Sequence, residues 1–330
     1  MSEADGVSAM PHTPTTRGPE RAASDAGSPH RIPVRHWARI LRRVVRHVLH
    51  DRLMVLSAGI SFFALLSIAP VLVTAVSVYG AVNTPEQALD QLSDVARVLP
   101  AELEPLVAEQ LTTITTASTQ VLTFRGLTGL VVALWTATTA ATYLIDALTL
   151  AYHETETRGF LRRTGLALVF VLGGALVLGG AIAAGGVLSR LLESAPDPVR
   201  ALEPVLTWIG LAVLMAAVLA VLYRFAPDRR RARWRWISGG AIIATLLWLA
   251  TSLGLFAYVQ SLGNYESTYG SLAGVAISMF WLWISVFLVI VGAAVNAESE
   301  RQTVRDSTVG PDRPVGERGA VVADSTPPYP

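Results

Sequence analysis

Residues 164–189 read TGLALVFVLGGALVLGGAIAAGGVLS, and this stretch without a charge decides the class of fold. An α-helix rises about 1.5 Å per residue, so about 20 such residues cross a hydrocarbon core of roughly 30 Å. A soluble fold built from many such helices would have no polar surface to offer water. Five other uncharged stretches have a comparable length, at 54–79, 126–145, 204–223, 236–260 and 271–297, and the second span is placed at 121–145. The sequence therefore predicts an all-α fold: a polytopic membrane helix bundle with six transmembrane helices.

Arginine supplies every basic side chain other than histidine, and it is concentrated in alternate gaps between the spans. The segment before the first span, the second and fourth gaps and the tail together hold 22 arginines. The intervening gaps hold only Arg97, Arg190 and Arg200, with Arg125 at a span boundary. Basic residues in short loops stay on the cytoplasmic side of a membrane. We therefore expect a multi-pass protein with both termini in the cytoplasm.

The two ends of the chain are expected to be disordered. Residues 1–30 are rich in Ser, Thr, Pro, Ala and Gly, and residues 301–330 have a similar character. Such segments have too little apolar surface to offset the entropy of ordering a chain. The membrane domain is therefore placed at 31–300.

An amphipathic helix is predicted just before the first span. From Pro33 to Leu49, apolar residues recur at helical spacing and arginines lie between them. Such a helix either lies on the cytoplasmic leaflet, with its arginines toward anionic lipid headgroups, or docks on the bundle as a basic helix. The lipid bilayer and its anionic headgroups are thus the expected partners.

The first external gap, at about 83–120, is long and acidic. Thr84, Pro85 and Gln87 have the spacing of a helix start, with a cap, a proline at the first helical position and a glutamine after it. We expect two short amphipathic helices here, over the outer mouth or in the membrane interface.

Small and polar residues inside the spans are expected to face other helices, because lipid does not satisfy them. For the threonines of the second span and the paired glycines of the third, close helix packing is the favoured interpretation, and the wall of a pathway is the alternative. Pro70 lies inside the first span, where it removes a backbone hydrogen bond and predicts a kink.

Four polar residues are expected at one cytoplasmic mouth, because the second, fourth and sixth spans all end on that side. They are Asp146, Arg224, Asn296 and Glu298. An unpaired charge near hydrocarbon is costly, so we expect Asp146 to pair with Arg224 or to bind substrate beside it.

A second candidate site lies in the short fifth loop. Its residues Tyr265, Thr268 and Tyr269 are expected at the external headgroup level. They serve there either as an interfacial anchor or as an outer gate.

No catalytic, cofactor or metal site is predicted. Cysteine is absent, and the histidines at positions 36, 47 and 50 lie on the amphipathic helix without acids at ligand spacing. His153 shares one short loop with Glu154 and Glu156. A nuclease that uses metal ions needs a cluster of such ligands. The arginines from 229 to 235 lie beside a span, where they fit a topology determinant, so no nucleic acid partner is expected.

Several segments together resemble the YihY/BrkB family of bacterial inner-membrane proteins. They are SAGISFFALLSIAP at 57–70, LIDALTLAYHETETRGFLRR at 144–163, LYRFAP at 222–227, YESTYGSL at 265–272 and GAAVNAE at 292–298. The resemblance covers about residues 35–300 and implies six spans in the inner (plasma) membrane of a bacterium. One departure is Ala294, which stands where the family usually has Glu.

The family resemblance implies a virulence or serum-resistance factor, and historically a ribonuclease, but the residues argue against the nuclease. Two functions remain. The first is a transporter or flippase for an amphipathic, envelope-related molecule. The alternative is a noncatalytic membrane scaffold or envelope assembly factor. The proline of the first span and the threonines of the second favour transport.

Overall fold

The computed structural model describes residues 26–82, 119–193, 196–200, 202–261 and 271–325. Their elements are η1 (Pro29–Arg31), α1 (Val34–His50), α2 (Leu53–Val82), α5 (Thr119–Ala151), α6 (Phe160–Glu193), α7 (Asp197–Arg200), α8 (Glu203–Phe225), α9 (Trp234–Ser261), α11 (Ser271–Glu300) and α12 (Val321–Asp324). Within these residues the fold is all-α, and an isolated bridge joins Ala232 to Thr308.

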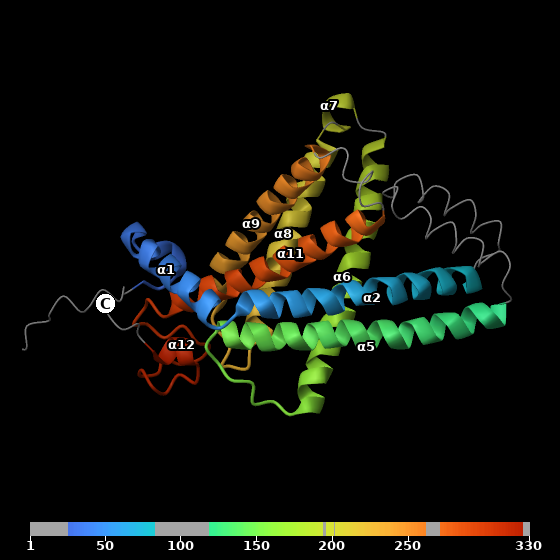
Figure 1. Cartoon of the computed structure of the whole chain (residues 1–330). Helices are drawn as coiled ribbons and strands as arrows, with labels where there is room; N and C mark the ends of the chain where they lie inside the picture. Colours follow the sequence, from blue (N-terminus) through green and yellow to red (C-terminus); the bar gives the residue numbers. More distant parts are fainter. Residues whose placement is uncertain (1–25, 83–118, 194–195, 201, 262–270, 326–330) are drawn as a thin grey trace, which may run out of the picture.

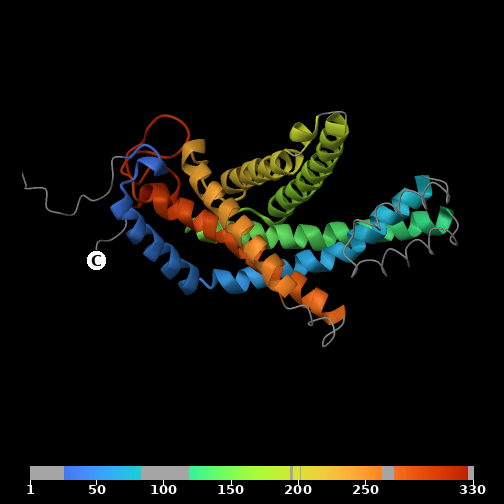
Figure 2. The ribbon, with the colours of Figure 1, turned by 90° about the horizontal axis from the view of Figure 1, so that it is seen from above.

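Six helices are long and apolar enough to cross a membrane: α2, α5, α6, α8, α9 and α11. This confirms the spans predicted from the sequence. Helices α2 and α5 lie side by side along most of their length (Figures 1 and 2). Helix α11 packs on both α2 and α9, whereas α6 and α8 are the least covered of the six.

Helices α2, α5, α9 and α11 extend from one end of the molecule, which we call the base, whereas α6 begins some way from it (Figure 1). Helix α1, the α5–α6 turn, the α8–α9 turn and the last turn of α11 meet there, together with the C-terminal segment, residues 301–325. Segments that hold most of the arginines thus come together at one end.

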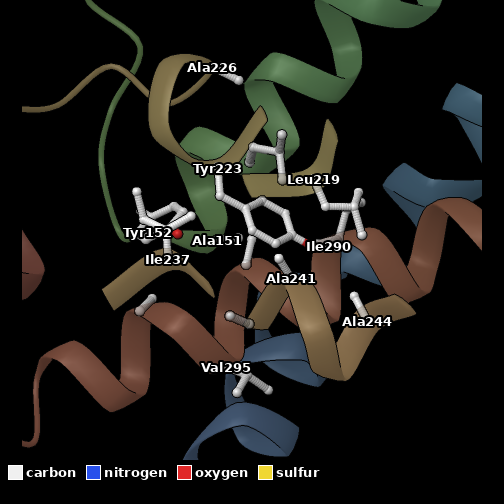
Figure 3. Close-up of a cluster of buried hydrophobic side chains, with 14 of the residues drawn as sticks. Ala151, Tyr152, Leu219, Tyr223, Ala226, Ile237, Ala241, Ala244, Ile290 and Val295 are labelled. Carbon is white, nitrogen blue, oxygen red and sulfur yellow. The ribbon is translucent and has the colours of Figure 1, made fainter. Parts of the chain in front are cut away.

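The apolar core lies beside the base, where α5, α8, α9 and α11 converge (Figure 3). Tyr223 of α8 is buried among Leu219, Ala241, Ala244 and Ile290. Its hydroxyl donates to the carbonyl of Val289 at 2.7 Å. The core therefore binds α8 to α11 by a hydrogen bond as well as by apolar contact.

Glycines allow α9 and α11 to cross closely. A Cβ atom on Gly240 would lie 2.2 Å from the carbonyl oxygen of Gly292, and one on Gly292 would lie 2.4 Å from the Tyr223 hydroxyl. The Asn296 side chain accepts from the Gly240 N–H at 2.6 Å and donates to the Ile237 carbonyl at 2.9 Å. This crossing is fixed by backbone contact and one amide.

The glycine pairs of α6 do not have the packing role expected for them. A Cβ built at Gly173, Gly179 or Gly185, or at the glycine that follows each, has no neighbouring atom within 4 Å. Helix α6 makes few contacts with the other helices, so no other helix covers the surface formed by these glycines. Five threonines of α5 donate hydrogen bonds to carbonyls of their own helix, as Thr139 does to Trp135 at 2.7 Å; the others are Thr128, Thr136, Thr142 and Thr149.

The expectation of a disordered tail is wrong for residues 301–325. Ser307 and Thr308 are fully buried, and the buried Arg318 donates to the carbonyls of Val304 and Ala323. The carboxylate of Asp306 accepts from the backbone N–H of Thr308. Charged side chains satisfy the backbone here, so the segment is ordered without the apolar runs that composition detects. Residues 1–25 lie outside the described residues.

Candidate functional site at the base

A buried carboxylate, Glu298, organises the base. It lies in the last turn of α11 and is 1% exposed. Arg43 of α1 donates from Nε to its Oε2 at 2.6 Å, and Arg301 donates to its Oε1 at 3.0 Å. His153 Nε2 is 2.9 Å from the same Oε1. Glu298 thus joins α1, the α5–α6 turn and α11 through three basic side chains.

Two histidines and an aspartate lie next to this carboxylate. His47 Nδ1 is 2.8 Å from Asp51 Oδ2, one helical turn later, and the rings of His47 and His153 are 4.0 Å apart between centroids. Burial lowers the pKa of His47, and His153 lowers it further, against the opposing effect of Asp51. The His47 side chain is buried, and its ring lies against that of His153 in the α5–α6 turn.

A second ion pair, between Arg229 and Glu300, is almost completely buried. The guanidinium donates to both carboxylate oxygens, at 2.5 and 2.9 Å, and the two side chains are 2% and 1% exposed. Ser307 donates to the same carboxylate, and Arg229 lies over the ring of Tyr152 at 5.0 Å. This pair holds the α8–α9 turn and the C-terminal segment to α11.

The expected pairing of Asp146 with Arg224 is wrong. Asp146 pairs with Arg163, whose Nη1 is 3.1 Å from Oδ1, and both side chains are about one third exposed, at 32% and 28%. Arg224 instead lies over the Trp234 ring at 4.4 Å and donates to the Ala232 carbonyl at 2.6 Å. A short turn brings α6 back beside the end of α5, so the nearest guanidinium comes from the next span rather than from α8.

The four predicted mouth residues therefore have different environments. Asn296 and Glu298 are buried and bonded within the protein, whereas Asp146 and Arg224 are partly exposed. Pro70 lies inside the continuous helix α2, and its carbonyl accepts from Thr74 at 2.8 Å. Tyr265, Thr268, Tyr269 and the first external gap at 83–118 lie outside the described residues, so their predicted roles stay predictions.

Several important residues were missed from the sequence: Arg43, His47, Asp51, Arg163 and Arg229. One signal was readable, since His47 and Asp51 are four residues apart on one helix and therefore share a face. The approach of His153 to His47 was not readable, because it depends on how α1 docks against the α5–α6 turn.

Six apolar helices that converge on a polar base define a polytopic α-helical membrane protein. The family model described as "Virulence factor BrkB" matches residues 44–316, and the chain belongs to that family, as its motifs suggested.

Two relatives illustrate the range of names. The "Putative ribonuclease-like protein YfkH" of Bacillus subtilis (strain 168) is 29% identical over 260 residues, which cover 76% of this chain and 91% of that protein. A "UPF0761 membrane protein" of Chromobacterium violaceum is 32% identical over 127 residues, which cover 37% of this chain and 28% of that protein. No solved structure matches the chain.

Proposed function

We propose that this protein binds an anionic, amphipathic molecule of the bacterial envelope at its base and moves it across the inner membrane. The observation that carries the proposal is the partly exposed Asp146–Arg163 pair. It lies where α5 ends and α6 begins, and α6 belongs to the least covered flank of the bundle. A lipid-like molecule in the cytoplasmic leaflet reaches this flank without entering the packed core.

The chemistry of Arg163 suits an anionic headgroup. Its Nη1 is occupied by Asp146, but its buried Nε has no hydrogen-bond partner. A guanidinium binds phosphate or carboxylate through two parallel N–H groups. A headgroup phosphate therefore competes with Asp146 for the same guanidinium, and the exchange provides a reversible binding step.

Helix α1 supports a position at an anionic membrane surface. Its buried face holds Ile40 and Val44, while Leu41, Val45 and Leu49 are between 51% and 65% exposed. Exposed arginines flank that apolar stripe: Arg35, Arg42 and Arg46. An exposed apolar stripe beside basic residues is typical of a helix in the interface plane. The helix thus combines docking on the bundle with a face that suits lipid.

The test uses liposomes that contain the purified protein and fluorescent phosphatidylglycerol or phosphatidylcholine, with dithionite as the quencher of outer-leaflet label. We expect faster flipping of the anionic lipid than in protein-free liposomes. Arg163→Gln should slow it about tenfold or more, since a hydrogen bond to a charged group contributes about 1.5–3 kcal/mol. Arg190→Gln, at the other end of α6, is the matched control and should flip at the wild-type rate.

A scaffold is the second candidate, and contacts between α9 and α11 favour it. Trp248 Nε1 donates to Ser285 Oγ at 2.9 Å, and Trp281 Nε1 donates to Ser252 Oγ at 3.1 Å. These polar groups serve helix packing rather than a pathway. If neither lipid flips faster in liposomes with the wild-type protein than in protein-free liposomes, the proposal of lipid transport is contradicted and the scaffold is favoured.

A further inference from the structure

The cluster of His47, Asp51 and His153 has the composition of a metal site. One ligand atom from each residue can be chosen so that all three lie within 4.8 Å of one another. Two residues come from α1 and its C-terminal cap, and the third comes from the α5–α6 turn, about a hundred positions later. The docking of α1 therefore creates a cluster that neither segment has alone.

His47 faces Asp51 through Nδ1, which is 2.8 Å from Asp51 Oδ2, and the His47 side chain is buried. Asp51 and His153 are 24% and 26% exposed, so water and ions reach the cluster from their side.

The backbone at His153 is a further sign that this side chain matters. His153 has φ of +59°, and Glu154 N–H donates to the Thr149 carbonyl while His153 N–H donates to that of Leu150. These bonds form a Schellman motif, whose left-handed position usually holds glycine. A side chain there costs about 1–2 kcal/mol. Histidine occupies this place, and its imidazole contacts His47 and Glu298.

We propose that His47, Asp51 and His153 bind one divalent first-row transition-metal ion, with Zn²⁺ as the reference ion. Two imidazole nitrogens and a carboxylate oxygen are ligands that Zn²⁺ and its neighbours accept, with water in the remaining position. Ligand atoms bonded at about 2.0 Å in a tetrahedral site lie about 3.3 Å apart. The chosen ligand atoms here lie within 4.8 Å of one another, so the site closes by up to about 1.5 Å when it binds the ion.

A neighbouring carboxylate supports this assignment. Glu298 holds the His153 ring from behind, as carboxylates commonly do for histidine ligands of metal ions. The bound ion would tie α1 to the α5–α6 turn and, through Glu298, to the end of α11.

The experiment measures metal content directly. The chain is purified in detergent without a polyhistidine tag, stripped with EDTA and dialysed against micromolar Zn²⁺, and bound zinc is counted by mass spectrometry. We expect about one ion per chain in the wild type. Because the sequence has no cysteine, thiolates contribute no background. Co²⁺ should give the visible absorption bands of a low-coordinate site.

Variants decide whether these residues hold the ion. His47→Ala, Asp51→Asn and His153→Ala should each weaken Zn²⁺ binding at least about tenfold, and Glu298→Gln about 10- to 100-fold. His36→Ala and His50→Ala, on the same helix outside the cluster, are the controls and should bind as the wild type does. Asp51→Asn changes a partly exposed residue and preserves its shape, so it tests binding in a folded chain.

Three outcomes overturn the proposal. The first is a wild-type chain that binds no more Zn²⁺ than buffer carries. The second is Asp51→Asn with an unchanged melting temperature in EDTA and unchanged Zn²⁺ affinity. The third is a loss of Zn²⁺ affinity in His36→Ala as large as that in His47→Ala.

Discussion

Single residues at the base satisfy buried charges through several partners each. Glu298 meets Arg43, His153 and Arg301, and Glu300 meets Arg229 through both oxygens. A buried ion pair is weak evidence for stability, because desolvation offsets the attraction. Removal of one member has a larger effect, since the remaining charge stays buried without a partner.

Arg229→Met should therefore destabilise the chain by about 3–5 kcal/mol. The double variant Arg229→Met, Glu300→Leu should recover most of that loss, because it removes both charges. Arg231→Gln, at an exposed arginine two residues along, is the control and should change stability by less than about 1 kcal/mol. Unfolding by denaturant in detergent measures all three. A double variant as unstable as the single one would show that the pair acts by more than charge balance.

At the scale of elements, the sequence predicted which helices form but not how they pack. The length and the lack of charge of each stretch were enough to predict the spans, because a helix that crosses the hydrocarbon core must be long and apolar. Small residues were a poorer guide to contact, since the glycine pairs of α6 are uncovered whereas Gly240 and Gly292 allow α9 and α11 to cross closely. Asp146 pairs with Arg163 rather than with Arg224, because the turn after α5 brings the start of α6 next to Asp146.

The close crossing of α9 and α11 can be tested by making the same glycine-to-alanine substitution at the crossing and on the uncovered helix α6. Gly240→Ala puts a methyl group 2.2 Å from a backbone oxygen, so α9 must move away from α11. We expect a large fall in melting temperature or loss of folded protein. Gly179→Ala meets no atom within 4 Å and should be neutral or stabilising by about 0.5–1 kcal/mol, since alanine is the better helix former. Equal melting temperatures for the two variants would contradict the close crossing.

For the whole molecule, the base unites the arginine-rich segments that the positive-inside rule predicts to be cytoplasmic. Alternation of arginine along the sequence and clustering of these segments in space are separate observations, and they agree. The C-terminal segment was mistaken for a disordered tail because its order rests on hydrogen bonds from Asp306 and Arg318 to backbone groups. Composition does not detect order of that kind.

The orientation in the membrane has a direct test, because the natural chain contains no cysteine. Glu317→Cys places a thiol at an exposed position of the C-terminal segment, and Arg190→Cys places one at an exposed position near the far end of α6. Most arginines belong to segments at the base, so we expect a membrane-impermeant maleimide to label position 190 in spheroplasts and position 317 only after the membrane is permeabilised. Labelling of position 190 but not of position 317 in intact spheroplasts would place the base in the cytoplasm. The reverse pattern would invert the topology and move the Asp146–Arg163 pair to the outer leaflet.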